Sequence, residues 1–183
     1  MSEKQPHNGV LFYAPTDARH IMVGTVSPQI KPDIKERPRR DPLEIFLARE
    51  IANSPIIVVD EDAPLNNAVK LMTKSEIGCL IVVSKKEKPI GIMTEGDIIA
   101  KVLAKDKNLN KMMAKEVMTS PLITIDSEVP IYGVARMMDQ YRIGRLGVIY
   151  KNKLVGIISK RDIVEFLPRM TEILQETPPW TYL

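Results

Sequence analysis

Two short motifs place a hydroxyl side chain three residues before a carboxylate, directly after a glycine and a short apolar run. Thr94 and Asp97 form the first motif, and Ser159 and Asp162 form the second. If a helix begins at each motif, its unpaired N–H groups and partial positive charge can bind a phosphate group. The carboxylate can accept hydrogen bonds from two hydroxyl groups of a ligand. The same spacing is that of a capping box, in which both side chains bind the helix's own backbone, so a binding role and a capping role both stay open.

The two motifs belong to a longer internal repeat. Residues 54–83 align with residues 120–149 at an offset of 66, and ten of the 30 aligned positions are identical. Unrelated segments of average composition would share about two. A one-residue deletion then changes the offset to 65, which aligns Gly91 with Gly156 and Asp97 with Asp162. The chain therefore carries a tandem duplication that spans residues 48–168.

Each copy is predicted to run strand, helix, strand, strand, helix. Short β-branched or apolar runs predict strands at residues 55–59, 79–83 and 89–93 in the first copy, and at 122–125, 146–150 and 154–158 in the second. Pro64 and Pro130 suit the first turn of the helix after the first strand, because the missing N–H of proline would have no partner there. Gly78 is expected to end that helix in the left-handed conformation, and Gly144 ends the matching helix of the second copy.

The closing helix of each copy is predicted to bury four apolar side chains. These are Ile98, Ile99, Val102 and Leu103 in the first copy and Ile163, Val164, Phe166 and Leu167 in the second. One copy with a three-stranded sheet is marginally stable alone, whereas two copies packed sheet to sheet share a core. We therefore expect an α/β fold of the α+β type, with tandem βαββα repeats and two small three-stranded sheets. The expected boundaries are an N-terminal extension at 1–47, repeats at 48–106 and 107–168, and a tail at 169–183.

The composition is that of an ordinary globular chain, with 183 residues of which 44% are hydrophobic and 27% charged. No apolar run approaches the ~20 residues that cross a bilayer, and the N-terminus lacks a signal-peptide pattern. The single cysteine, Cys79, fits a reducing interior, so we expect a cytoplasmic protein. Catalysis is not expected, because the histidines His7 and His20 lie in the N-terminal segment and no metal spacing or nucleophile set is visible.

Residues 1–47 are rich in proline and are the hardest part to interpret. Two apolar patches, residues 10–13 and 21–26, could form strands. The mixed-charge stretch at 31–41, with five basic residues, is either a solvated linker or a nucleic-acid-binding arm. Leu43, Phe46, Leu47 and Ile51 follow at helical spacing and predict an amphipathic helix that leads into the first repeat.

The duplicated order of elements, the closing motif in both copies and residues 117–121 before the second copy resemble a pair of CBS domains, also called a Bateman module. The resemblance covers about two thirds of the chain. It implies a stand-alone regulatory protein whose two repeats pack with pseudo-two-fold symmetry and bind adenosine-containing ligands in clefts between them. AMP, ADP, ATP, S-adenosylmethionine and NAD-type molecules are the implied ligands, and no resident cofactor is expected.

The resemblance also implies which residues form the ligand sites. Asp97 and Asp162 would accept the hydroxyl groups of a ribose, and Thr94 and Ser159 would help the helix N-termini to hold phosphate. The start of each first strand would line the adenine. The full predicted set is Ser54, Pro55, Ile56, Thr94, Asp97, Thr119, Ser120, Pro121, Leu122, Arg142, Arg145, Ser159, Lys160, Arg161 and Asp162.

The two predicted sites differ in charge. The second copy carries four basic residues around its motif, Arg142, Arg145, Lys160 and Arg161. The matching positions of the first copy hold Glu76, Cys79, Glu95 and Gly96. Coulomb attraction in a partly desolvated site would make the second copy the stronger phosphate binder. The alternative is that these residues are solvated surface charges.

We therefore expect a homodimeric sensor of a cytoplasmic adenine nucleotide that signals to a protein partner, with ligand binding shifting a conformational equilibrium. Two alternatives stay open. One is a nucleic-acid-binding adaptor that uses the basic residues at 31–40 and 142–161, whose affinity would fall steeply with salt. The other is a structural interaction module with empty clefts. A membrane partner is not expected.

Overall fold

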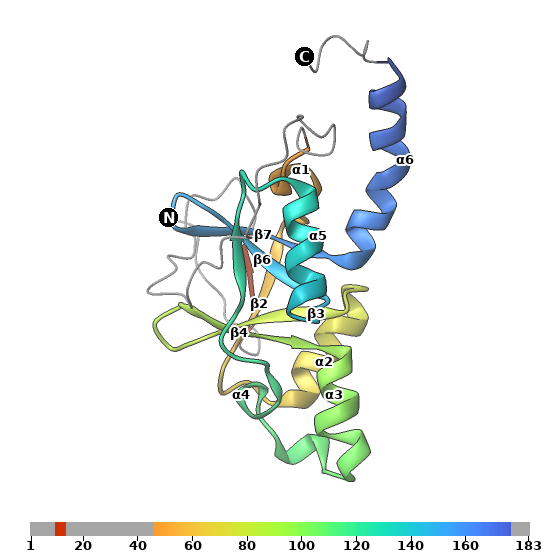
Figure 1. The fold of residues 1–183 in the computed structure, drawn as a ribbon. Helices are drawn as coiled ribbons and strands as arrows, with labels where there is room; N and C mark the ends of the chain where they lie inside the picture. Colours follow the sequence, from red (N-terminus) through yellow and green to blue (C-terminus); the bar gives the residue numbers. More distant parts are fainter. Residues whose placement is uncertain (1–9, 14–45, 177–183) are drawn as a thin grey trace. The chain divides into compact units, whose positions relative to one another are not determined.

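The computed structural model describes residues 10–13 and 46–176, which fall into two compact units (Figure 1). The described part of the first unit comprises residues 10–13 and 55–123, and that of the second comprises residues 46–54 and 124–176. The fold class predicted from the sequence is confirmed, since each unit combines a small mixed sheet with helices. Within the described ranges, no helix has both the length and the apolar character that crossing a bilayer requires.

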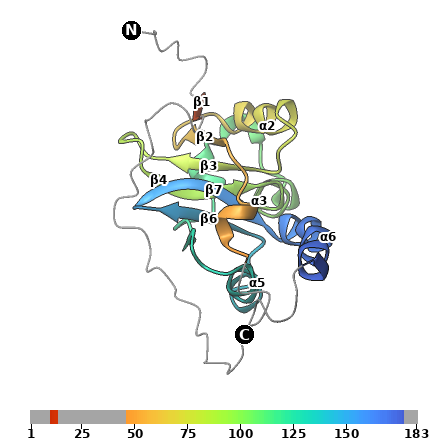
Figure 2. The ribbon, with the colours of Figure 1, turned by 90° about the horizontal axis from the view of Figure 1, so that it is seen from above.

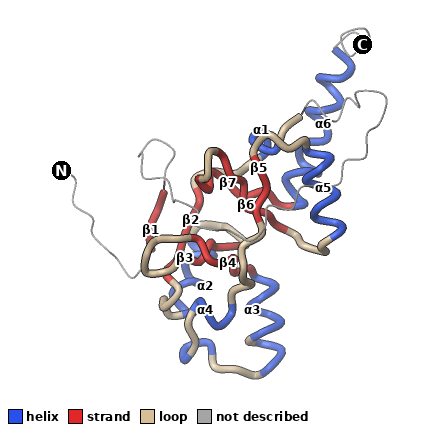
Figure 3. The backbone as a smooth tube through the Cα atoms, turned by 60° about the vertical axis from the view of Figure 1, so that its left-hand side comes forward, coloured by secondary structure: helices blue, strands red, loops and turns tan. Residues whose placement is uncertain are grey.

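The first unit is built on a sheet with the order β1-β2-β3-β4 (Figure 3). Its strands are β1 Val10–Tyr13, β2 Ile56–Asp60, β3 Cys79–Val83 and β4 Pro89–Thr94. β2 and β3 are parallel and are joined by α2 (Leu65–Lys74), because parallel neighbours need a crossover connection. β3 and β4 form the predicted hairpin. β1 pairs antiparallel with β2 and adds a fourth strand to the predicted three; the patch at residues 21–26 lies outside the described residues.

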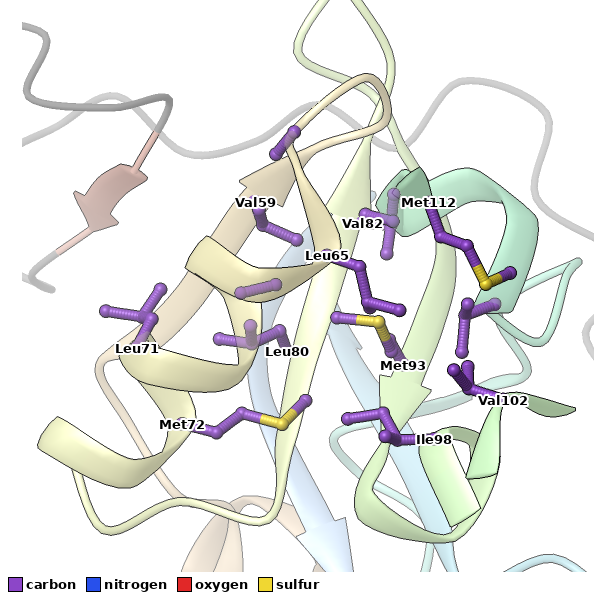
Figure 4. Packing of buried hydrophobic residues seen from close by; sticks show 14 residues of the cluster. Val59, Leu65, Leu71, Met72, Leu80, Val82, Met93, Ile98, Val102 and Met112 are labelled. Carbon is purple, nitrogen blue, oxygen red and sulfur yellow. The ribbon is translucent and has the colours of Figure 1, made fainter. Parts of the chain in front are cut away.

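The core of the first unit lies between this sheet and its helices (Figure 4). The remaining helical elements are α3 Glu95–Lys101, η2 Leu103–Lys105, η3 Leu109–Lys111 and α4 Ala114–Val117. Leu65 of α2, Leu80 of β3 and Met93 of β4 are fully buried and point toward one another. Burial of such side chains stabilises the unit by about 1.5–3 kcal/mol each.

The second unit repeats the arrangement with the sheet order β5-β6-β7, of which β6 and β7 are seen side by side in Figure 2. Its elements are α1 Ala48–Ile51, β5 Thr124–Asp126, α5 Ile131–Gln140, β6 Arg145–Tyr150, β7 Lys153–Ser159 and α6 Lys160–Glu176. The predicted helix that leads into the first repeat is reduced to the single turn of α1, and residues 43–45 lie outside the described part of the chain. Leu146, Val148 and Ile158 are fully buried in the sheet of this unit.

The segment that leads into each repeat packs in the unit of the other repeat. We call residues 46–54 the first leading segment and residues 112–120 the second. In the second unit, Ala48 N–H donates to the Val129 carbonyl at 2.8 Å and Asn53 forms a bridge with Ile157. In the first unit, Ala114 N–H donates to the Ala63 carbonyl at 2.9 Å. Thr119 there forms the matching bridge with Ile92.

The prediction that the closing helix of each copy buries four apolar side chains is wrong. Ile99 and Leu103 are 59% and 56% exposed, and Val164 and Leu167 are 63% and 49% exposed. The apolar stripe of each closing helix is wider than the face that packs within its own unit, so only the residues nearest the sheet, such as Ile98, are buried.

The left-handed residue after α2 is Glu76 rather than Gly78, and after α5 it is Arg142 rather than Gly144. The reason is that α2 ends at Lys74 and α5 ends at Gln140, so the left-handed position comes two residues before each glycine.

Candidate functional site

Both hydroxyl–carboxylate motifs lie where a strand meets a helix. β4 ends at Thr94 and α3 begins at the next residue, while β7 ends at Ser159 and α6 begins after it. Thr94 Oγ1 accepts from the N–H of Asp97 at 3.1 Å, and Ser159 Oγ accepts from that of Asp162 at 3.3 Å. In return, Oδ2 of each carboxylate accepts from the backbone N–H of its partner, at 2.9 Å from Thr94 and 2.6 Å from Ser159. The capping role is therefore realised in both copies, and it leaves Oδ1 of each carboxylate for other partners.

In the first unit, Oδ1 of Asp97 is also occupied. It accepts from Thr119 Oγ1 at 2.7 Å and from the ammonium group of Lys101 at 2.8 Å. The Asp97 side chain is only 12% exposed. Burial alone would raise the pKa of the Asp97 carboxyl, but the hydrogen bonds from Lys101, Thr94 and Thr119 outweigh it and hold the pKa below its usual value.

The Lys101 ammonium group joins α3 to the second leading segment. Besides Asp97, it donates to the carbonyl oxygens of Val117 at 2.8 Å and Met118 at 3.1 Å, and to Thr119 Oγ1 at 2.9 Å. An ammonium group has three protons, so these acceptors use its full donor capacity. Sequence reasoning missed Lys101, although its position four residues after Asp97 on a helix is typical of an ion pair.

In the second unit, Oδ1 of Asp162 accepts no hydrogen bond within the described residues. The position that matches Lys101 holds Phe166, whose ring packs edge-on against Phe46 with centroids 5.4 Å apart. The position that matches Thr119 holds Asn53, whose backbone forms the equivalent bridge, with Ile157, but whose side-chain amide has no hydrogen bond in the described part of the chain. Asp162 is thus held in place by Ser159, and its Oδ1 has no donor among the described residues.

Of the four basic residues predicted around the second motif, Arg145 is the one that the sheet places directly opposite Ser159. Arg145 begins β6 directly opposite Ser159 on β7, and directly opposed residues project from the same face of a sheet. Lys160 and Arg142 are exposed, and Arg142 occupies the left-handed turn after α5. Arg161 points along its own helix, where it forms an ion pair with Glu165 at 2.6 Å that raises the pKa of its guanidinium group.

The matching positions of the first unit carry no positive charge. Cys79 lies opposite Thr94 in the sheet, where Arg145 faces Ser159 in the second unit. Glu95 begins α3 at the position that matches Lys160. α3 is also short, with 7 residues against 17 in α6.

The residues predicted to line the adenine are divided between the units. Ser54 belongs to the second unit and is exposed, whereas Pro55 and Ile56 lead into β2 of the first. Ser120 and Pro121 are exposed in the first unit, where Ser120 Oγ donates to the Ile90 carbonyl at 2.8 Å. Leu122 of that unit is buried.

Among the described residues, no group of three or more histidine, cysteine or acidic side chains could hold a metal ion.

The fold and the repeated motif define a protein with two CBS domains. The model of the CBS domain family matches residues 48–104 and 114–169, and the chain belongs to this family. CBS-domain pairs are generally regulatory modules that bind adenosine-containing ligands, and they are typically not enzymes.

Several characterised and uncharacterised proteins are similar to the chain. An uncharacterized protein of Methanopyrus kandleri is 30% identical over 131 residues, which cover 69% of this chain and 65% of that protein. Hypoxic response protein 1 of Mycobacterium tuberculosis is 30% identical over 121 residues, covering 66% of this chain and 85% of that protein. The chain thus spans slightly less than two thirds of the archaeal relative and most of the mycobacterial one.

A solved structure of the hexameric CBS-CP12 protein from bloom-forming cyanobacteria is also similar. It superposes with a TM-score of 0.62 at 35% identity, covering 67% of this chain and 74% of that one.

Proposed function

We propose that this chain is a regulatory module that binds an adenosine-containing nucleotide through its second repeat and passes the signal to a protein partner. The observation that carries the proposal is Oδ1 of Asp162, which accepts no hydrogen bond from any residue that the structure describes. A carboxylate that is already oriented by Ser159 loses little conformational entropy when a ligand binds. Oδ1 can then accept both hydroxyl groups of a ribose, which is the chemistry that nucleosides offer.

The charge around Asp162 supports a phosphorylated ligand. At the N-terminus of α6 the backbone N–H groups of Ser159, Lys160 and Asp162 are already hydrogen-bonded within the unit. What favours a phosphate there is the positive end of the 17-residue helix together with the exposed side chain of Lys160, its first residue. Arg145 lies across the sheet from Ser159 and forms no ion pair within the described residues. A guanidinium group with no internal partner can bind a phosphate without first breaking a salt bridge. The proposal is one of binding rather than catalysis, in keeping with what is typical of the family.

We also propose that the chain forms a homodimer. The closing helical segment of each unit exposes apolar side chains: Ile99 of α3 and Leu103 of η2 in the first, and Val164 and Leu167 of α6 in the second. Ile99 and Val164 are equivalent positions of the repeat, so both copies expose an apolar side chain at the same place. Contact of such side chains with water is unfavourable, and exposed apolar patches often mark interaction surfaces. The cyanobacterial CBS-CP12 protein is described as hexameric, which shows that a related chain self-associates.

Calorimetric titration with AMP, ADP, ATP, S-adenosylmethionine and NAD tests the nucleotide proposal. We expect one or more of them to bind and Asp162→Ala to weaken binding at least about tenfold, because one charged hydrogen-bond partner is typically worth about 1.5–3 kcal/mol. Asp139→Ala, which removes an exposed carboxylate from α5 of the same unit, is the matched control and should bind as the wild type does.

A second measurement uses the folded state itself. A ligand that binds only the folded protein stabilises it by about 2.7 kcal/mol at a hundredfold excess over its dissociation constant, so the melting temperature should rise. No shift with any of the five ligands at millimolar concentration would contradict the proposal. Tight binding of nucleic acid that weakens steeply with salt and ignores nucleotides would instead favour an adaptor function.

A further inference from the structure

We propose that Lys101 closes the first-repeat site, so that the chain binds one nucleoside and does so at the second repeat. The inference rests on the proposed function, and it concerns a residue outside both motifs. Asp97 and Asp162 are equivalent in the repeat and are capped in the same way. Within the part of the chain that the structure describes, Asp97 alone has its remaining oxygen hydrogen-bonded by other side chains.

The internal contacts of Asp97 imitate a bound ligand. A ribose offers two hydroxyl donors to one carboxylate, and Oδ1 of Asp97 already accepts two donors, from Thr119 at 2.7 Å and Lys101 at 2.8 Å. A nucleoside would have to displace both. Displacing Lys101 would also leave the carbonyl oxygens of Val117 and Met118 without their donor and would leave the carboxylate without its counter-charge.

The second repeat has neither a lysine nor a threonine at the two positions that supply donors to Asp97 in the first repeat. Phe166 stands where Lys101 stands in the first repeat, and it packs against Phe46 instead of reaching the carboxylate. Asn53 stands where Thr119 does, and it keeps the backbone bridge without a side-chain hydrogen bond in the described part of the chain. The cap hydrogen bonds and the backbone bridge are therefore the same beside the two carboxylates, and the side chains at these two positions decide whether Oδ1 has an internal donor.

Lys101 carries more of this effect than Thr119. Its ammonium group contacts the carboxylate, both carbonyl oxygens and the Thr119 hydroxyl, so it holds Thr119 in its position as well. Replacing Lys101 by methionine keeps most of the apolar stem and removes the charge. Thr119 can then rotate away, and Oδ1 of Asp97 becomes available as Oδ1 of Asp162 is.

The test is the number of ligands bound per chain, measured by equilibrium dialysis with adenosine and AMP. Adenosine is the main probe, because Glu95 at the start of α3 would repel a phosphate in the opened first site. We expect one adenosine per chain in the wild type, none in Asp162→Ala and two in Lys101→Met. The matched control is Lys105→Ala, an exposed lysine in η2 with no ion pair among the described residues, which should keep one.

The outcomes separate this inference from the proposed function. Two adenosines per wild-type chain, or one in a folded Lys101→Met, would overturn the role of Lys101 and leave the nucleotide site of the second repeat standing. No binding in the wild type with one in Lys101→Met would overturn the second-repeat site alone. No binding in any variant would overturn both. If Lys101→Met does not fold, Asp162→Ala decides, because adenosine that it still binds with the wild-type affinity must occupy a first-repeat site that is not closed.

Discussion

Asp97 and Asp162 occupy equivalent positions, yet the two carboxylates differ in how many hydrogen bonds they accept. Among the described residues, Asp162 accepts only from Ser159, whereas Asp97 accepts from Thr94, Thr119 and Lys101. A helix cap alone is worth about 1 kcal/mol. The additional partners of Asp97 tie α3 to the second leading segment, so this carboxylate stabilises the first unit more than Asp162 stabilises the second.

This difference predicts unequal costs for Asp97→Asn and Asp162→Asn at neutral pH. We expect Asp97→Asn to lower the free energy of unfolding by about 1.5–3 kcal/mol, since it removes the charge that Lys101 and Thr119 bind. Asp162→Asn loses only part of a cap and should cost about 1 kcal/mol or less. Urea denaturation of the two variants and the wild type at pH 7 provides the comparison, and equal costs would contradict the structural role of Asp97.

The cost of Asp97→Asn should also depend on pH. The folded-state pKa of Asp97 is lowered, so its contribution is fully present above the unfolded-state pKa of about 3.9. That contribution is lost as the pH falls through the folded-state value. We therefore expect the gap between wild type and Asp97→Asn to shrink when urea denaturation is repeated at pH 3. A gap that stays constant from pH 7 to pH 3 would show that the charge of Asp97 is not what stabilises the fold.

At the scale of elements, two glycines let the leading segments approach the sheets. A Cβ atom on Gly91 of β4 would lie 2.8 Å from Met118 Sδ and from the Thr119 carbonyl oxygen. A Cβ atom on Gly156 of β7 would lie 2.8 Å from the Cβ atom of Ala52. Both distances are shorter than atoms tolerate, so the glycines are needed for packing and not for an unusual backbone angle.

We predict that Gly91→Ala and Gly156→Ala each lower the free energy of unfolding by about 1–3 kcal/mol through overpacking. Gly144→Ala is the control, because no atom lies within 4 Å of its added Cβ and its φ is not left-handed. It should be neutral or stabilise by about 0.4–1 kcal/mol. Thermal and urea denaturation give the values. Ala52→Gly should recover part of the loss in Gly156→Ala, and failure of this double variant to recover any would show that the close contact is not the cause.

The sequence predicted the elements well and the positions of individual side chains less well. The ten identities between the copies were enough to predict the duplicated strand order, because strands and helices follow from local apolar periodicity. The exposure of Ile99 and Val164 was not predictable, since an apolar stripe does not show how much of it the chain will cover. The partners of Asp97 were missed because Thr119 is 22 residues away from it, and only the folded backbone brings the two together.

At the scale of the whole molecule, the exposed apolar residues of α3, η2 and α6 predict self-association. We expect a dimer at micromolar concentration in sedimentation runs. Ile99→Glu and Val164→Glu should each raise the dissociation constant at least about tenfold, because burying one such side chain is worth about 1.5–3 kcal/mol. Ala100→Glu, at the neighbouring exposed position of α3, is the control for the added charge. A monomeric wild type, with and without nucleotide, would contradict the prediction.

The exchange of leading segments bears on how such a chain could have arisen. Residues 46–54 complete the unit that holds the second repeat, and residues 112–120 complete the unit that holds the first. A single-repeat ancestor with the same architecture could not have completed its own unit; it would have taken its leading segment from a second molecule, in a reciprocal swap. Gene duplication and fusion would then have joined two chains that already depended on each other. A cut between the repeats would leave each half with the leading segment that completes the other unit, so we expect neither half to form its complete unit alone.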